Sequence, residues 1–384
     1  MSPQFLIANA EQLLPYAILL LAFLLLVFQS ELARNRLFDA PVLGLLILFA
    51  GFRDAITPDM ERYREMYEGI GSGASFPLEP VFLFFSRLLN WIGLDYHALF
   101  FVFTFLTLLF IYLGIRNYTS HANLSLLLYT LIPACFLNLF VEMREAGAVA
   151  VAFYATSVWN RKDINFRYRM PAVLALAVLS FLFHFSAILY WPIYLVSYRF
   201  IRKPHSLSLY LPLATLTLLI PTSLLMGAIS TVALPFVPAR YQGYIALFMD
   251  IQTAAESGQL LKTLIYVAIA VSFVVWRSRS SMRSSDEGIV PLNLFIIGIV
   301  LLNLTRSLAA ASRLAYFFLI YQIVIFPVLL EKVKDRVTRL ATTYSVVIFY
   351  LAQFAWGLAY YSEEAANYPF LRFRNLIISL LHWG

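Results

Sequence analysis

Residues 51–70, GFRDAITPDMERYREMYEGI, combine charged residues and tyrosines between two long apolar segments. Only 13% of the chain is charged, so this run stands apart from its surroundings. Asp59, Tyr63 and Tyr67 are four residues apart, which places them on one face of a helix. A carboxylate and two phenols on one face suit the hydroxyl groups of a sugar or a lipid headgroup. The alternative is an interfacial amphipathic helix with tyrosines at headgroup level.

Further ionisable residues lie at the ends of apolar segments, where an unpaired charge costs about 3 kcal/mol. A simpler interpretation exists for each: a lone histidine in an apolar segment is often a packing residue, and an arginine can snorkel to the interface. Independent snorkelling does not predict that so many would gather on one predicted side. We therefore expect a site there, formed by Arg53, Glu79, Glu142, Arg144, Glu145, His184, Arg306 and Arg313.

These residue types indicate a site that binds an anionic substrate. The sequence has no HExxH, no clustered metal ligands, no glycine-rich phosphate loop and no GxSxG motif. Guanidinium groups bind pyrophosphate well and stabilise it as a leaving group. A metal-independent transfer of a group activated by a lipid diphosphate fits this inventory, with no cofactor and no nucleic acid. The acceptor hydroxyl would need a base, for which His184 and an outer carboxylate such as Glu142 are candidates.

The elements that carry these residues are predicted to be membrane spans. Hydrophobic residues make up 61% and aromatic residues 16% of the chain, with a mean hydropathy of +0.78. Cys135 is the single cysteine, so the sequence predicts no disulfide framework. We expect an all-α polytopic membrane protein, one transmembrane domain over 1–384, with about twelve helices. The predicted spans are 12–30, 40–52, 97–115, 122–141, 144–160, 170–187, 188–200, 207–231, 259–276, 289–305, 313–330 and 340–360.

The basic residues predict the orientation of these spans. Six connections share one side and contain 17 of the 28 basic residues, which makes that side cytoplasmic by the positive-inside rule. The outer side then receives the loops 53–77 and 232–258, which we expect to line the site. The basic residues of the six connections are Arg34, Arg36, Arg116, Arg161, Lys162, Arg167, Arg169, Arg199, Arg202, Lys203, Arg277, Arg279, Arg283, Lys332, Lys334, Arg336 and Arg339.

Residues 78–93, LEPVFLFFSRLLNWIG, allow two interpretations. They are apolar enough to span the membrane but contain Arg87 and Asn90. If they cross, the first two spans reverse and 53–77 becomes cytoplasmic. If they form a re-entrant or interfacial helix, every other loop keeps the side that its charge favours. We prefer the second interpretation, because 53–77 contains more acidic than basic residues.

The order of these features resembles the EpsG branch of the Wzy-type family of bacterial polysaccharide polymerases. The resemblance extends over nearly the whole chain and rests on short motifs. Two positions depart from the family pattern: Pro58 stands where the family has glycine, and Glu145 where it has glutamine. The matching residues are Arg53, Asp59, Tyr63, Tyr67 and Glu79-Pro80, then Arg144-Glu145-Ala146-Gly147-Ala148, His184-Phe185-Ser186-Ala187, Arg313 with Tyr316-Phe317-Phe318, and Asn367-Tyr368-Pro369.

The resemblance implies a GT-C-like membrane glycosyltransferase that makes exopolysaccharide or O-antigen. Such an enzyme joins oligosaccharide repeat units carried on undecaprenyl diphosphate, at the outer face of the cytoplasmic membrane. Arg144, Arg306 and Arg313 would hold the diphosphate, and Asp59 or His184 would orient or deprotonate the acceptor. A chain-length regulator and a flippase of the same pathway are the implied partners.

Two other functions fit the same inventory. An O-antigen-ligase-like transferase would share the arginines and the histidine, but such enzymes usually have a large outer loop, and the outer loops here are modest. A transporter or flippase of lipid-linked sugars would be expected to show internal repeats and charges near the membrane midplane. We find no convincing repeat, and the charges lie at one predicted face.

Overall fold

The computed structural model describes residues 10–33, 39–54, 57–220, 256–279, 288–306, 313–364 and 375. These residues are helical or irregular, and the only bridge of β type among them is an isolated pair, Arg53 with Asn375. The chain divides into two compact units, Met1–Ala187 with Val333–Gly384, and Ile188–Lys332. Each unit is described by itself below.

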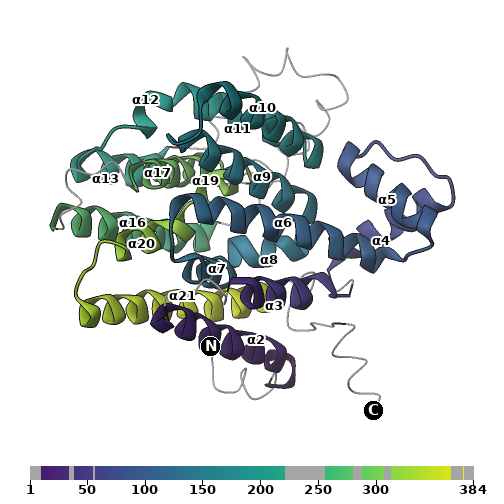
Figure 1. The fold of residues 1–384 in the computed structure, drawn as a ribbon, viewed down its shortest axis with the longest axis horizontal. Coiled ribbons are helices and arrows are strands. Elements are labelled where there is room, and N and C mark those ends of the chain that lie inside the picture. The colour runs from purple at the N-terminus through teal and green to yellow at the C-terminus, as the bar shows by residue number, and fades with distance from the viewer. Residues whose placement is uncertain are drawn as a thin grey trace. The chain divides into compact units, whose positions relative to one another are not determined.

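The first unit is a bundle of helices (Figure 1). Pairs that pack together include α2 with α3, α3 with α6, α6 with α9, α9 with α10, and α21 with α7 and α8. Its helices are α2 (Ala10–Ala33), α3 (Asp39–Gly51), α4 (Pro58–Gly71), α5 (Pro80–Ile92), α6 (Tyr96–Tyr118), α7 (Ala122–Leu131), α8 (Pro133–Val141), α9 (Met143–Asn160), α10 (Phe166–Phe183) and α21 (Arg336–Glu364).

Helix α9 lies between α6 and α10 and is largely buried. Its sequence is rich in alanine and glycine, which lets neighbouring helices approach closely. A Cβ on Gly147 would lie 2.5 Å from the ring of Phe183 in α10. On the other side, the Phe153 ring of α9 occupies the space beside Gly114 of α6. The small residues therefore fix the spacing of α9 from α6 and from α10.

Polar contacts fix one end of this bundle. The carboxylate of Asp39 accepts hydrogen bonds from Tyr112 (2.9 Å), Arg116 (2.8 Å) and Asn123 (2.9 Å), which ties the start of α3 to α6 and α7. Arg161 donates to the Asn117 side chain at 3.2 Å, so the end of α9 lies at the same end. The connections 116–121 and 161–169, both predicted to be cytoplasmic, thus meet at one end of the unit.

The predicted span 122–141 is broken in the structure. Helices α7 and α8 are bent by 67° at Ile132 and Pro133. Pro133 is the first residue of α8, where its missing N–H breaks no helical hydrogen bond. Helix α21 packs against this corner, since a Cβ on Gly357 would lie 2.5 Å from the Pro133 ring. The proline explains the break, and the bend directs the end of α8 toward the end of α3.

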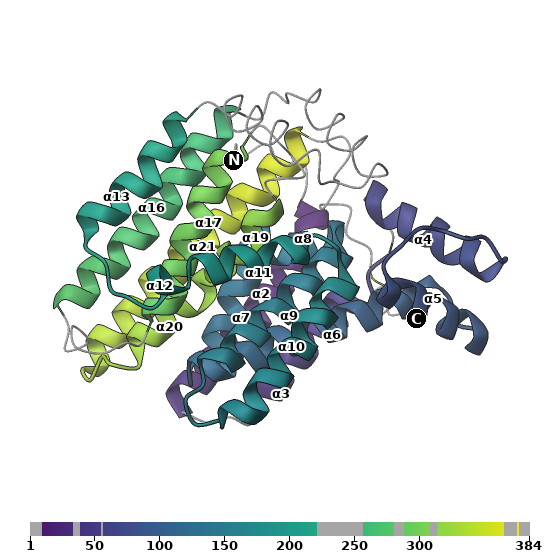
Figure 2. The same ribbon diagram turned by 90° about the horizontal axis from the view of Figure 1, so that it is seen from above.

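Helices α4 and α5 form a pair beside the start of α6, set off from the other helices of the unit in both views (Figures 1 and 2). Helix α4 begins with Thr57, whose side chain accepts a hydrogen bond from the Met60 N–H, followed by Pro58 at the first helical position. Proline is favoured at that position, so Pro58 supports the start of α4.

Helix α5 starts and ends at the same end of the first unit. It begins after Glu79, which contacts the start of α9, and stops at Gly93, which adopts a left-handed conformation with φ of 84°. Helix α6 then starts at Tyr96. The starts of α6 and α9 both lie at the end of the unit opposite the basic connections. The re-entrant or interfacial placement of 78–93 remains a prediction. Trp91 is 83% exposed on its outer face.

The second unit consists mainly of α11 (Ala187–Val196), α12 (Tyr198–Ile201), α13 (Leu207–Leu216), η2 (Thr217–Leu219), α16 (Glu256–Arg279), α17 (Ile289–Leu304), η6 (Arg313–Ala315), α19 (Tyr316–Leu319) and α20 (Gln322–Leu330). Two buried asparagines of α17 hold it together. The Asn293 side chain donates to the backbone carbonyls of Phe200 and Ile201 in α12 and of Lys203 just after it. It also accepts a hydrogen bond from the Tyr210 hydroxyl. Asn303 donates to the Ala214 carbonyl of α13 and accepts from Thr263 of α16.

The described helices are those of a membrane-embedded protein. Four of them are long and apolar enough to cross a membrane, or five if the bent pair α7–α8 counts as one span, and seven shorter apolar helices accompany them. The described part of the chain therefore confirms the all-helical membrane class. The expected total of twelve spans and the GT-C-like architecture remain predictions.

Candidate functional site

Three ionisable residues from distant parts of the chain meet in the first unit. One carboxylate oxygen of Glu79, Oε2, forms an ion pair with Nη1 of Arg144. The other, Oε1, lies 3.6 Å from Nε2 of His184. The Glu79 side chain is 6% exposed, and those of Arg144 and His184 are 18% and 24% exposed. Sequence reasoning selected all three residues, and the structure brings them together.

Helix ends position this cluster. Glu79 is the N-cap of α5, Arg144 lies in the first turn of α9, and His184 is the C-cap of α10. The N-terminal end of a helix favours a carboxylate and disfavours a cation, so Glu79 is well placed while Arg144 is not. The Glu79 carboxylate offsets that cost. A cation held at a helix N-terminus adds to the local attraction for an anion.

The close packing of α10 on α9 sets the position of His184. Ser180 of α10 donates a hydrogen bond to the Ala148 carbonyl of α9 at 2.8 Å. Phe183, directly before His184, fills the space that Gly147 leaves open. The antiparallel helices therefore bring the end of α10 next to the start of α9, where Arg144 lies.

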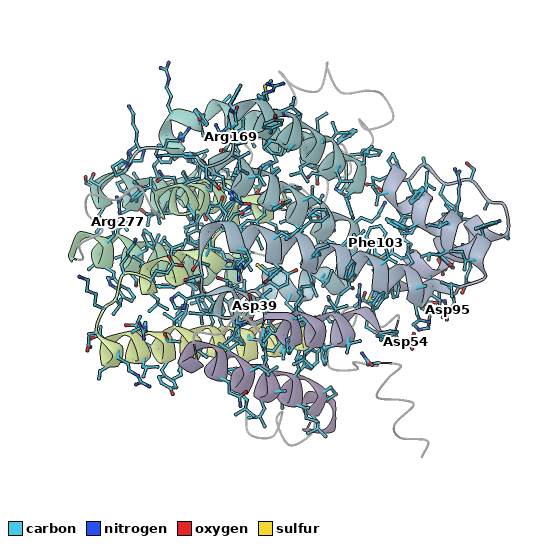
Figure 3. All side chains as sticks on the ribbon, in the orientation of Figure 1. Asp39, Asp54, Asp95, Phe103, Arg169 and Arg277 are labelled. Atoms are coloured by element: carbon cyan, nitrogen blue, oxygen red, sulfur yellow. The ribbon has the colours of Figure 1, made fainter. Side chains whose placement is uncertain are left out.

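Aromatic rings form one wall of the cluster. The Arg144 guanidinium lies 5.2 Å from the ring centre of Tyr63 and 5.7 Å from that of Phe82. Phe82 contacts Phe103, and Phe103 contacts Phe183. Figure 3 labels Phe103 on α6, toward the end that carries Asp54 and Asp95 and away from Asp39. Rings beside a guanidinium strengthen its binding by cation–π attraction and exclude water.

Tyr63 links the cluster to two further carboxylates. Burial raises the pKa of the Tyr63 phenol; Arg144 opposes this shift, and Glu142 and Asp59 add to it. Both carboxylates thus lie close enough to act on Tyr63. Glu142 occupies the junction between α8 and α9, and Asp59 the first turn of α4. Tyr63 thus contacts Arg144 and lies within the electrostatic reach of Asp59 and Glu142.

The ring of His184 has a defined arrangement. Its Nδ1 lies 2.7 Å from the Ser186 hydroxyl oxygen and 3.3 Å from the Ser186 backbone nitrogen, which donates to it. A backbone N–H can only donate, so Nδ1 accepts this hydrogen bond. Nε2 is the ring nitrogen that faces Glu79. Ser186 and the Glu79 carboxylate hold the imidazole from opposite sides.

Arg53 is placed differently from Arg144. It is fully buried, and its guanidinium donates to the carbonyls of Ala50 and Leu139 and to the hydroxyl of Thr104 at 2.6 Å. The two carbonyls belong to the last turns of α3 and α8, whose free acceptors and negative dipole ends favour a cation. Arg53 thus joins the ends of α3 and α8 to α6.

The remaining candidates of the first unit are also buried. Tyr67 is 2% exposed, and its hydroxyl donates to the Leu94 carbonyl at 2.6 Å, which closes the α4–α5 pair. Burial raises the pKa of Tyr67 to about 12, so this donor keeps its proton across the physiological range. Glu145 is 2% exposed, one residue after Arg144. Asp59, Tyr63 and Tyr67 follow one another at intervals of one turn on α4, as predicted. The Tyr63 and Tyr67 side chains are buried.

Three predicted residues belong to the second unit. Arg306 follows α17 and donates to the carbonyls of Asn303 (2.9 Å) and Ile220 (3.0 Å). Arg313 opens η6 and Tyr316 opens α19, and both elements pack against α17. The predicted outer loop 232–258 lies almost wholly outside the described residues, as do residues 307–312 between the two arginines and the segment Asn367-Tyr368-Pro369.

Sequence reasoning missed Phe82 and gave Ser186 no role. Phe82 lies in an apolar run with no chemical signal to separate it from its neighbours. Ser186 was visible beside His184, but spacing alone does not show that its hydroxyl meets the ring. Among the described residues, no three of His, Cys, Asp and Glu are grouped so that they could hold a metal ion.

Comparison with known proteins gives one result over most of the chain. Residues 37–374 match the EpsG family. No curated protein and no solved structure matches the chain. The matched segment includes every candidate residue named above and confirms the resemblance that the motifs indicate.

Proposed function

The chain belongs to the EpsG family, and on that premise we propose that it polymerises oligosaccharide repeat units carried on undecaprenyl diphosphate. Family membership indicates a membrane-embedded polysaccharide polymerase of the glycosyltransferase kind with a lipid-linked sugar as substrate. The proposal adds the lipid diphosphate donor, the outer face of the cytoplasmic membrane as the site of reaction, and a reaction that needs no metal ion.

The observation that carries the proposal is the meeting of Glu79, Arg144 and His184. Arg144 is a cation that can bind a diphosphate, and His184 is an imidazole that can accept the proton of an acceptor hydroxyl. The two side chains lie next to the two oxygens of the same Glu79 carboxylate. Both are at the end of the first unit opposite the basic connections 116–121 and 161–169. If those connections are cytoplasmic, the cluster faces outward.

Each residue then has a stated role. Arg144 binds the diphosphate and stabilises the charge that develops on it as the glycosidic oxygen leaves. Tyr63 and Phe82 keep the guanidinium dry and oriented. His184 accepts the proton of the acceptor hydroxyl, while Asp59 and Glu142 are the carboxylates available to orient sugar hydroxyls. Arg306, Arg313 and Tyr316 remain predicted substrate contacts on the strength of the sequence.

The proposal is tested with purified protein in liposomes that carry a lipid-linked repeat unit on the accessible face. No nucleotide sugar is added, and parallel reactions contain a chelator. We expect products lengthened by whole repeat units, with or without the chelator. A protein that only moves the repeat unit across the bilayer would be a flippase, and transfer to a different acceptor without lengthening would indicate a ligase-like enzyme. Either result would reject the proposal.

A further inference from the structure

We propose that the exposed face of α5 docks on the headgroup layer of the bilayer, where Arg87 binds lipid phosphates between the side chains of Phe84 and Trp91. These three residues have no part in the proposed transfer, so the inference goes beyond the proposed function. It places α5 along the membrane surface rather than across the membrane, and it names the lipid group that holds the helix there.

Helix α5 has two different faces. One is buried in the first unit. The other contains Phe84, Arg87 and Trp91, which are exposed and are three and four residues apart, so they form one stripe along the helix. Phe84 is 59% exposed, and Ile92 and Leu94 add further exposed apolar surface where the helix ends. Apolar side chains exposed in this number indicate a contact surface, and tryptophan is typical of the headgroup layer.

Helix α4 indicates how α5 lies in the membrane. The two helices are joined, because the Tyr67 hydroxyl donates to the Leu94 carbonyl at 2.6 Å and the Asn90 side chain donates to the Tyr67 carbonyl at 3.1 Å. On the open side of α4, Arg64 pairs with Glu61 at 2.7 Å, and both side chains are more than one third exposed. If α5 crossed the hydrocarbon core, it would bring these charges into the core with it, which is strongly unfavourable.

The length of α5 agrees with a position at the surface. Its 13 residues extend over about 20 Å, which is less than the thickness of the hydrocarbon core. A helix of this kind lies in the plane of the membrane with its apolar side toward the acyl chains. The charged side of α4 then faces water.

Arg87 supplies the charge complementarity of this surface. On a helix in the membrane plane its guanidinium lies near the lipid phosphates, whose oxygens match the two parallel donors of arginine. Phe84 and Trp91 lie about one turn away on either side, at the depth that aromatic side chains favour. Docking also sets the depth of the candidate site, because Glu79, the N-cap of α5, pairs with Arg144. The cluster is thereby held near the level of a lipid diphosphate.

The depth of α5 is measured with spin labels on Phe84→Cys and Trp91→Cys in liposomes of phosphatidylglycerol. Both side chains are exposed, so neither change disturbs the packing. Arg62→Cys, on the exposed side of α4, is the control, and the native Cys135 is buried and should give little background. Collisions with oxygen report on the acyl region, and collisions with a water-soluble nickel chelate report on water. We expect positions 84 and 91 at equal depth, about 5–10 Å into the interface, and position 62 in water.

Two results would overturn the docking of α5. One is nickel access at positions 84 and 91 as high as at position 62. The other is a difference in depth of about 10 Å between positions 84 and 91, which is the rise expected over seven residues of a helix that crosses the membrane.

The role of phosphate is measured with the label at position 84, in liposomes of phosphatidylglycerol and of an uncharged glycolipid without phosphate. We expect nickel access to be roughly fivefold higher in the glycolipid. Arg87→Gln should show the higher access in both lipids, whereas Arg62→Gln, the matched control, should keep the difference. Equal access in the two lipids with Arg87 present, or a difference that persists in Arg87→Gln, would overturn phosphate binding. Neither readout needs polymerisation, so failure here leaves the proposed function intact, and a chain that makes no polymer leaves the docking intact.

Discussion

Two arginines that look equivalent in the sequence, Arg53 and Arg144, differ in the structure. Both lie at the end of an apolar segment next to acidic residues. Arg53 is fully buried and bonds to backbone carbonyls, whereas Arg144 pairs with a side chain and keeps 18% of its own side chain exposed. Sequence predicts that each arginine needs a partner. It does not predict whether that partner is a helix end or a carboxylate that a ligand could replace.

Arg53 gives a prediction about stability. Arg53→Ala should lower the free energy of unfolding by roughly 2–4 kcal/mol, because it leaves the last carbonyls of α3 and α8 without their charged donor. The measurement is the thermal unfolding midpoint in detergent, with the exposed Arg62→Ala on α4 as control. A midpoint equal to that of the control would contradict the role of Arg53 as a joint between helices.

The helices were largely predictable from apolar patterning, while their ends and breaks depend on particular residues. The segments 97–115 and 144–160 correspond closely to α6 and α9. The span 122–141 was expected to be continuous, and the structure breaks it at Pro133, where tertiary packing by α21 supports the bend. A hydropathy profile does not predict such a bend. It also does not predict beside which small residue an aromatic ring of a neighbouring helix will pack.

Gly147 provides a prediction about the packing of α10 on α9. Gly147→Ala should lower the free energy of unfolding by roughly 1–3 kcal/mol and reduce activity, since its Cβ would displace the Phe183 ring and with it His184. Gly44→Ala in α3 is the matched control: nothing lies within 4 Å of its Cβ, and alanine there should be neutral or stabilising by about 0.5–1 kcal/mol. Unfolding in detergent and polymer yield are measured together. A harmless Gly147→Ala would contradict the assigned packing.

For the whole molecule, charge distribution was the most informative property of the sequence. The predicted basic side corresponds in the first unit to one end of α6, α9 and α10, and the ionisable cluster lies at the other. The sequence could place these groups on one side because spans alternate in direction. It could not identify which of them touch, because contacts between side chains of distant helices depend on helix spacing and tilt.

The orientation can be tested in intact cells with an impermeant thiol reagent. Cysteines placed at Lys162 and Lys334 should be protected, and a cysteine at Ser72, exposed after α4, should be labelled. The native Cys135 is buried and should give little background. Labelling of the Lys162 position together with protection of Ser72 would reverse the assignment and place the cluster in the cytoplasm.

The central claim is that the Glu79–Arg144–His184 cluster is the polymerising site rather than a structural ion pair. The first unit supplies its own control, because Asp39 and Arg116 form a second ion pair between helices at the opposite end. The decisive measurement is polymer length and yield per folded protein for Arg144→Ala and Arg116→Ala in the liposome assay. We predict that Arg144→Ala abolishes polymer, that Arg144→Lys restores little of it because an ammonium cannot bind a diphosphate as a fork, and that Arg116→Ala retains polymer of wild-type length. Polymer of normal length from Arg144→Ala, or equal losses in the Arg144→Ala and Arg116→Ala variants, would contradict the account.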